Sequence, residues 1–279
     1  MTLVEVTDLC VAYPQGRRAA GRRGPAELPR LAVHDVNLSL GRGEVLGVVG
    51  ESGSGKTSLA RCLSGYQTAT SGTIRIDGRV VTADRDQRDR RRLQMVFQDP
   101  YSSLNPALTL GQALREPIAV HRLRPPDQIQ ERVDELMILV GLDRSYLEAK
   151  PRRLSGGQRQ RASIARALAL EPEVLVADEP VSALDVSVQA VILNLLAELR
   201  ENLGMSILFI SHDMAVVSHL CDRVVVMTEG RIVESGSVDD VFLRPQHSYT
   251  QQLLAAVPPH PWDDPAAPTP GASIPGPSQ

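Results

Sequence analysis

The stretch from Leu154 to Asp185 constrains the fold of this chain more than any other part of the sequence. It opens with a glycine-bearing turn, Leu154–Gln158 (the signature turn), which leads into apolar residues at helical spacing. The helix expected over 161–170 ends at Glu171-Pro172 and is followed by a short apolar run, Val174–Ala177. This order predicts a helix followed by a buried parallel strand, as in an open α/β sheet.

Two carboxylates, Asp178 and Glu179, come directly after this predicted strand. Open α/β sheets bind their ligands at the carboxyl ends of strands, so we expect chemistry there. The signature turn has two explanations. The backbone N–H groups at its helix start can form an anion site, or Ser155 can simply cap the helix. The cap would suffice for an isolated turn, whereas the Asp-Glu strand downstream favours the anion site.

A second motif, Gly50–Thr57 (the phosphate loop), matches G-x-x-x-x-G-K-[ST]. The context that this motif demands is present, with a strand predicted over 44–49 and a helix over 58–63. Its glycines let the backbone wrap around phosphates, Lys56 reaches the β- and γ-phosphates, and the Thr57 hydroxyl ligates Mg²⁺. A glycine turn without a ligand is the alternative, and the Asp-Glu strand disfavours it.

Composition sets further bounds on the class of protein. A length of 279 residues with 42% apolar residues predicts one large domain, or a domain with a smaller subdomain. The net charge of −3 argues against a nucleic-acid surface over the whole domain, and we interpret the charged run 85–92 as a solvated helix face. Three dispersed cysteines predict the cytosol and no disulfide framework. A signal peptide and an apolar run long enough to span a bilayer are not expected from the sequence.

The remaining elements are predicted from alternation, apolar runs and turn residues. We expect an edge strand over 2–13 and a flexible loop over 15–30, with the later elements as follows: strands at 36–40, 93–97 and 205–210, hairpins over 74–81 and 224–234, and helices at 128–140 and 188–199. Eight prolines among small residues predict that 257–279 is disordered.

The order of the signature turn, the strand ending in Asp-Glu, and Ser182–Asp185 resembles the nucleotide-binding subunit of ABC transporters. The resemblance implies an α/β fold: a P-loop NTPase core with a mixed β-sheet, an antiparallel β edge and an inserted α-helical subdomain. It places the nucleotide-binding domain at 1–240 and the helical subdomain at about 99–154. Gln98 would lie in the Q-loop and His212 in the H-loop, whereas from the residues alone an ordinary loop glutamine and a structural histidine remain alternatives.

The resemblance also implies ATP and Mg²⁺ as cofactors, with a role for each site residue. Glu179 would be the catalytic base, assisted by His212, Gln98 and Lys56, and Mg²⁺ would be held by Thr57, Gln98 and Asp178. The residues expected at the chain's own ATP are Tyr13, which offers its ring to adenine, and Gly50, Glu51, Ser52, Gly53, Ser54, Gly55, Lys56, Thr57 and Ser58. Those expected at the ATP of a partner cassette are Ser155, Gly156, Gly157 and Gln158.

Near the C-terminus, His247–Pro258 resembles the C-terminal motif of dipeptide and oligopeptide importer ATPases, with Ser248 where proline is usual. It implies a C-terminal motif over 241–258 followed by a Pro-rich disordered tail, 259–279. Some relatives carry C-terminal cysteines for an iron–sulfur cluster. Because no cysteine follows Cys221, we expect no cluster in this chain.

This subfamily resemblance implies an ATPase subunit that powers peptide import from the cytoplasmic face of the cell membrane, as a peripheral protein. The implied partners are a second ABC ATPase, two transmembrane permease subunits and, indirectly, an extracytoplasmic solute-binding protein, with no nucleic acid. We expect a heterodimer of ATPases, with a homodimer as the alternative. Two other functions stay open, namely the same motor serving nickel or another small solute, and a soluble ABC ATPase without a transport role.

Overall fold

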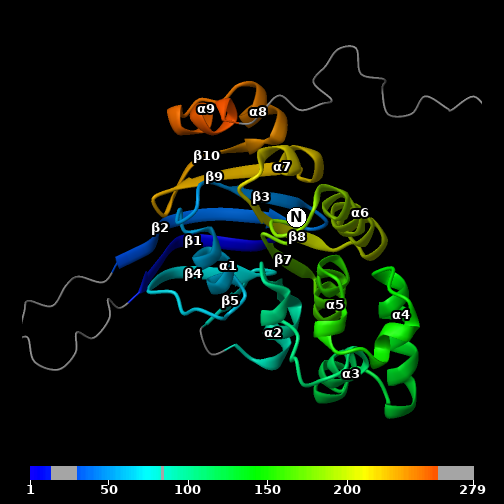
Figure 1. The fold of residues 1–279 in the computed structure, drawn as a ribbon. Helices are drawn as coiled ribbons and strands as arrows, with labels where there is room; N and C mark the ends of the chain where they lie inside the picture. The colour runs from blue at the N-terminus through cyan, green and yellow to red at the C-terminus, as the bar shows by residue number, and fades with distance from the viewer. Residues whose placement is uncertain (14–29, 83–84, 257–279) are drawn as a thin grey trace, which may run out of the picture.

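The fold is that of a computed structural model, which describes residues 1–13, 30–82 and 85–256. Two β-sheets lie side by side, with helices packed around them (Figure 1). The expectations for the loop over 15–30 and for the tail after 257 fall almost wholly outside the described residues. The arrangement of the two sheets determines where the predicted site residues meet.

The larger sheet has six strands in the order β10-β9-β3-β8-β7-β6. Its strands are β3 (Val45–Val49), β6 (Leu93–Val96), β7 (Val174–Asp178), β8 (Ser206–Ser211), β9 (Arg223–Thr228) and β10 (Arg231–Ser237). All neighbours are parallel except β10, which pairs antiparallel with β9. Every residue of β3, β7 and β8 is buried, which explains why these strands are continuous apolar runs rather than alternating ones.

The smaller sheet is antiparallel, with the order β2-β1-β4-β5. Its strands are β1 (Thr2–Tyr13), β2 (Arg30–Gly41), β4 (Ser71–Ile76) and β5 (Arg79–Val81). The prediction that 2–13 forms an edge strand was wrong, because β1 lies between β2 and β4. The alternation of apolar and polar residues shows that one face of the strand is buried, but it does not show whether the strand has one or two hydrogen-bonded neighbours. The hairpin predicted at Asp77-Gly78 is confirmed, and both residues have positive φ (55° and 75°), as a type I′ hairpin turn requires.

Helix α1 contacts strands of both sheets, and the longest helix, α6, lies next to α5 (Figure 1). The α-helices are α1 (Lys56–Leu63), α2 (Gln87–Arg92), α3 (Leu110–Val120), α4 (Ile129–Leu139), α5 (Gly156–Leu168), α6 (Val186–Leu203), α7 (Met214–Leu220), α8 (Val238–Leu243) and α9 (Ser248–Ala255). Short 3₁₀ turns occupy 100–102, 126–128, 144–148 and 151–153. The segment between β6 and the signature turn is therefore helical, as expected for an inserted subdomain, although its boundaries stay a prediction.

Two sequence predictions about helices need correction. Helix α5 begins at Gly156 rather than at 161, because Ser155 caps it and the polar residues that follow continue the helical turn. The charged run 85–92 is not simply a solvated face, since Arg85 and Asp89 are both buried.

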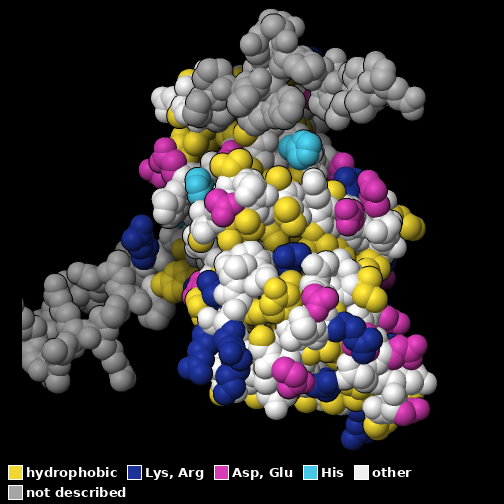
Figure 2. All heavy atoms as spheres, turned by 45° about the vertical axis from the view of Figure 1, so that its right-hand side comes forward, with side chains coloured by type: hydrophobic (Ala, Val, Ile, Leu, Met, Phe, Trp, Pro, Cys, Tyr) yellow, Lys and Arg dark blue, Asp and Glu magenta, His cyan; other side chains and the backbone are white. Residues whose placement is uncertain are grey.

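Over the right-hand part of the face in Figure 2, acidic and basic side chains are interspersed. None of the helices among the described residues is long and apolar enough to cross a membrane.

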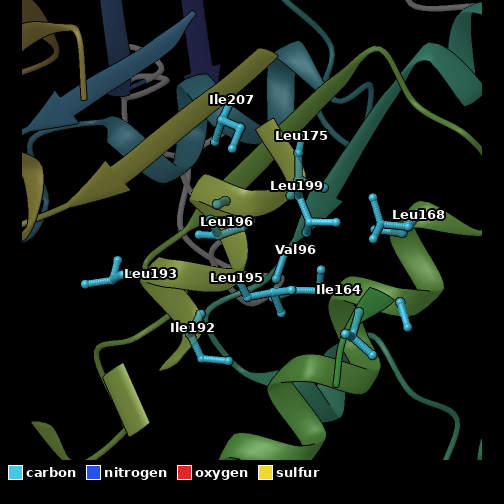
Figure 3. Close-up of a cluster of buried hydrophobic side chains, with 14 of the residues drawn as sticks. Val96, Ile164, Leu168, Leu175, Ile192, Leu193, Leu195, Leu196, Leu199 and Ile207 are labelled. Carbon is cyan, nitrogen blue, oxygen red and sulfur yellow. The ribbon is translucent and has the colours of Figure 1, made fainter. Parts of the chain in front are cut away.

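The buried side chains form two hydrophobic clusters, and β3 contributes to both. Val45 and Val49 belong to the cluster that includes α3–α6, and Leu46 and Val48 belong to the cluster that includes α1 and the antiparallel sheet. Figure 3 shows part of the first cluster, with side chains of α5 and α6 gathered against Val96, Leu175 and Ile207 of the sheet. Strand β3, which leads into the phosphate loop, is thus packed on both faces.

Candidate functional site

The site lies at the carboxyl ends of three neighbouring parallel strands. Strand β3 leads into the phosphate loop, β7 ends at Asp178-Glu179, and β8 ends at Ser211-His212. Because β8 pairs with both β3 and β7, and all three run in the same direction, these chain segments emerge along one edge of the sheet. The sheet order therefore brings together residues that are more than 100 positions apart.

The phosphate loop is closed tightly by its neighbours. Gly50, Gly53 and Gly55 have φ values of 150°, 84° and 105°, a region that favours glycine. A Cβ added at Gly50 would collide with the Met227 carbonyl oxygen, and one added at Gly55 with the Ala32 carbonyl oxygen. Gly50 and Gly55 are thus required both by conformation and by the close approach of other backbone segments, whereas Gly53 is favoured by conformation alone.

Lys56 lies folded back over this loop. Its ammonium donates to the carbonyl oxygens of Gly50 (2.7 Å) and Glu51 (2.8 Å), and the residue is only 4% exposed. Burial lowers the pKa of Lys56, against the opposing attraction of the nearby carboxylates, of which Glu179 has the largest effect. The loop thus holds a desolvated positive charge with carbonyl oxygens as its partners.

Thr57 and Asp178 meet beside the loop. The Thr57 hydroxyl donates to Oδ1 of Asp178 at 3.2 Å, and Asp178 is 2% exposed. Burial raises the pKa of Asp178, and the hydrogen bond from Thr57 opposes that effect. Hydroxyl and carboxylate oxygens are donors that suit Mg²⁺, which also retains water and phosphate ligands. Among the described residues no cluster of three or more His, Cys, Asp or Glu side chains could hold a metal, so a cation here would depend on such a mixed shell.

Glu179 is held between two other predicted site residues. Nε2 of Gln98 donates to its Oε2 at 2.9 Å, and Nδ1 of His212 lies 3.3 Å from its Oε1. The residue has φ of 46°, which is unusual for a side chain with a Cβ, and its N–H donates to the Ile210 carbonyl oxygen at 3.0 Å. Left-handed backbone outside glycine costs about 1–3 kcal/mol and clusters at functional sites. The structure brings Gln98 to this carboxylate, and Gln98 has no described hydrogen bond to Thr57 or Asp178.

The other predicted nucleotide residues lie on the same edge or near it. The Tyr13 hydroxyl is 3.2 Å from the Ser58 hydroxyl, so the two side chains are adjacent, with Tyr13 half-buried. Glu51, Ser52 and Gly53 are exposed, whereas Ser54 is buried and its carbonyl oxygen accepts from the N–H of Gly230 at 3.0 Å.

The signature turn is a complete helix cap within its own segment. The Ser155 hydroxyl accepts from the Gln158 N–H (3.2 Å), and the Gln158 side-chain oxygen accepts from the Ser155 N–H (2.8 Å). Nε2 of Gln158 also donates to the Tyr146 hydroxyl at 2.8 Å. Gly156 is half-buried, and Gly157 is buried, so close to Val188 that a Cβ there would collide with that side chain. None of the hydrogen bonds among the described residues joins this turn to the phosphate loop.

Two residues at the site were not assigned a role from the sequence. The Ser182 hydroxyl donates to the Glu179 carbonyl oxygen (3.1 Å) and lies 3.4 Å from Nε2 of Gln98. The Tyr249 hydroxyl accepts from the N–H of Glu51 at 3.0 Å, although the two residues are 198 positions apart. Each lies in a motif noted in the sequence, but a motif does not show which distant segment it contacts.

Comparisons with known proteins bear on this geometry. The profile of the family described as "ABC transporter" matches residues 33–182, more than half of the chain. A putative peptide import ATP-binding protein of Brucella ovis is 48% identical over 227 residues, covering 80% of this chain and 72% of that protein. The dipeptide transport ATP-binding protein DppF of Escherichia coli is 44% identical over 259 residues, covering 92% of this chain and 76% of DppF.

Solved structures with the same fold agree with the family match. Chain cbiO1 of Clostridium perfringens superposes with a TM-score of 0.74 at 31% identity, covering 87% of this chain and 91% of that one. The dimeric ATP-binding cassette MJ0796, solved with ADP and Pi, gives a TM-score of 0.72 at 28% identity, covering 85% and 99%. The predicted P-loop NTPase fold is confirmed by these neighbours. This chain therefore belongs to the ABC transporter family, as an ATP-hydrolysing member that carries the nucleotide-binding fold.

Proposed function

We propose that this chain is the ATPase subunit of an importer of dipeptides or oligopeptides. The proposed ATP hydrolysis rests on the position of Glu179, which Gln98 and His212 contact. It lies at the same edge of the sheet as Lys56 and Thr57. The peptide cargo is supported by identities of 44–50% to relatives named for peptide or dipeptide transport. The match to DppF extends over 92% of this chain.

In the proposed reaction, a water molecule attacks the γ-phosphorus of ATP. A new P–O bond forms as the bond to the β–γ bridging oxygen breaks, and ADP leaves with that electron pair. Glu179 orients the water and accepts its proton, while His212 contacts the γ-phosphate and keeps Glu179 in line. Thr57, Asp178 and Gln98 would hold Mg²⁺, which would neutralise part of the charge on the phosphates. Lys56 and the amides of 53–57 bind the phosphates, and Tyr13 stacks on adenine.

Ser155, Gly156, Gly157 and Gln158 are assigned to the ATP of a second cassette. The assignment to a second cassette is supported by the described hydrogen bonds of the signature turn, none of which joins it to the chain's own phosphate loop. Two cassettes would then enclose two ATP molecules in a head-to-tail dimer, which ATP closes and hydrolysis opens. The MJ0796 cassette is dimeric in its solved form, which supports the arrangement. We propose a heterodimer with a related ATPase, and a homodimer is the alternative.

The remaining proposed partners are two permease subunits, which would hold the chain as a peripheral protein at the cytoplasmic face of the membrane, and indirectly a solute-binding protein. In this scheme 1–240 is the nucleotide-binding domain, the helices of about 99–154 transmit motion to the permease, and 241–258 is the importer-type motif. The ATPase residues do not contact cargo, so nickel or another small solute is the competing cargo.

The first test is co-purification of the tagged full chain from its native membrane. We expect two permease-like subunits and a second, similar ATPase in the complex, together with peptide uptake that is lost in a Glu179→Gln strain. Uptake of nickel in place of peptides would contradict the assignment of peptides as the cargo. Ribosomal or DNA-repair proteins in place of permeases would overturn the transport function.

A further inference from the structure

The C-terminal helix α9 reaches the phosphate loop through one side chain. The Tyr249 hydroxyl accepts a hydrogen bond from the backbone N–H of Glu51 at 3.0 Å. Among the hydrogen bonds of the described residues, this is the one that joins 241–256 to the phosphate loop. It involves the loop's second residue, which precedes the amides assigned to the phosphates.

The same peptide unit has a second partner on its opposite side. The N–H of Glu51 and the C=O of Gly50 belong to one planar trans peptide, so the two groups point in opposite directions. The Gly50 carbonyl oxygen accepts from the ammonium of Lys56 at 2.7 Å. The peptide between Gly50 and Glu51 is therefore held by Tyr249 on one side and by Lys56 on the other. Rotating it away from the tyrosine would also turn the Gly50 carbonyl away from the ammonium.

Helix α9 is fixed firmly enough to hold this peptide in place. The Glu234 carboxylate of β10 accepts from the N–H groups of Gln246 (2.7 Å) and His247 (3.1 Å), just before the helix begins. The His247 side chain then caps the helix by accepting from the Tyr249 N–H at 3.2 Å. Tyr249, with Leu253 and Leu254, packs against the larger hydrophobic cluster. In Figure 1, α8 and α9 lie together beyond β10.

We propose that Tyr249 is a positioning residue for the phosphate loop. By fixing the peptide between Gly50 and Glu51, its hydroxyl sets the conformation in which the loop and Lys56 receive nucleotide. The C-terminal segment thereby tunes the affinity for ATP, whereas the hydrolysis step depends on Glu179. This role rests on the proposed function, because it presupposes that ATP binds at the phosphate loop.

The test compares the full-length wild-type chain with Tyr249→Phe, which removes the hydroxyl and keeps the ring. We expect the Kd and KM for MgATP to rise about three- to tenfold, the effect of losing one net hydrogen bond, with kcat within about twofold of wild type. Amide exchange at Glu51 should accelerate, while α9 keeps its protection. The control is Tyr66→Phe, since Tyr66 is 60% exposed, contacts Phe97 through its ring, and its hydroxyl takes part in none of the described hydrogen bonds.

The outcomes separate this role from the proposed function. If the wild type binds ATP and Tyr249→Phe leaves both the Kd and the Glu51 exchange rate unchanged, Tyr249 has no positioning role. If exchange accelerates along all of α9, Tyr249 acts only by docking the helix, and the positioning role is likewise wrong. If the wild type itself binds no ATP, both the proposed function and this role fail.

Discussion

The phosphate loop and the signature turn are both glycine-bearing turns at the start of a helix, yet they are stabilised in different ways. The phosphate loop is held from outside by Tyr249, Gly230 and the strands beside it, and its lysine is desolvated. The signature turn satisfies its own polar groups through a capping box. A glycine-bearing helix start can thus be fixed by distant segments of the chain, as the phosphate loop is, or by its own residues, as the signature turn is.

The largest effect is expected from the Glu179→Gln variant, which tests whether ATP is hydrolysed beside the phosphate loop. Replacing Glu179 with Gln removes the proposed base but keeps a hydrogen-bond partner for Gln98. We expect phosphate release to fall about 10²–10⁴-fold, with ATP still bound. The matched control is Glu171→Gln, because Glu171 is another glutamate with positive φ (52°) but pairs with Arg124 away from the loop. A wild-type rate in Glu179→Gln would remove Glu179 from the mechanism.

The second prediction tests the signature turn by comparing two capping boxes. Ser155→Ala should lower the ATPase rate of the assembled transporter about tenfold or more, because it removes a contact to the partner's nucleotide as well as a helix cap. ATP affinity of the separate chain should change less than twofold. Thr109→Ala removes the corresponding cap of α3, and both variants should lose about 1 kcal/mol of stability. Equal ATPase rates in the two variants would mean that Ser155 is only a cap.

The third prediction concerns stability at the phosphate-loop end. Burial raises the pKa of Asp178, so its ionised form costs stability at neutral pH, and the cost disappears as the pH falls and the carboxyl protonates. Asp178→Asn should therefore raise Tm by roughly 2–4 °C at pH 7–8, with a smaller gain at low pH, while Mg²⁺-dependent hydrolysis is lost. The control is Asp143→Asn, since Asp143 is exposed and its pKa is lowered, mostly by a hydrogen bond with the Ser145 side chain. A drop in Tm for Asp178→Asn would show that its charge is a net stabiliser.

The smallest effect concerns the outside support of the phosphate loop. Burial raises the pKa of Glu234, but the N–H groups of Gln246 and His247 and the Thr250 side chain outweigh it, so the pKa lies below its ordinary value. Such a group stabilises the fold at neutral pH and loses that contribution as the pH falls through its native pKa. We expect Glu234→Gln to weaken ATP binding up to about twofold at pH 7 by loosening α9. Hydrogen exchange at the amides of 246 and 247 measures the loosening, and unchanged exchange would contradict it.

The sequence predicted the buried strands better than it predicted the neighbours of each segment. Strands β3, β7 and β8 were predictable because a strand buried on both faces must be apolar throughout. Asp178, Glu179 and His212 could be placed on one edge because parallel strands end together. The interior position of β1 could not be predicted, because edge and interior strands show the same alternation of apolar and polar residues. The burial of Arg85 could not be predicted either, because a charged run has the same sequence whether one of its side chains is exposed or buried. The contact between Tyr249 and Glu51 depends on the docking of α9, which leaves no local pattern in the sequence.

The position of β3 between β8 and β9 in the sheet also has a consequence during synthesis. Its Val45 pairs with Ile207 in β8, and its Leu46 pairs with Arg223 in β9, so both neighbours of this strand are encoded far downstream. A ribosome must therefore translate about four-fifths of the chain before the strand that carries the phosphate loop can enter its sheet. Such non-local pairing makes folding slow and leaves apolar segments exposed in the nascent chain. The hydrogen bonds between the phosphate loop and Gly230 and Tyr249 must likewise wait until those later residues have been synthesised.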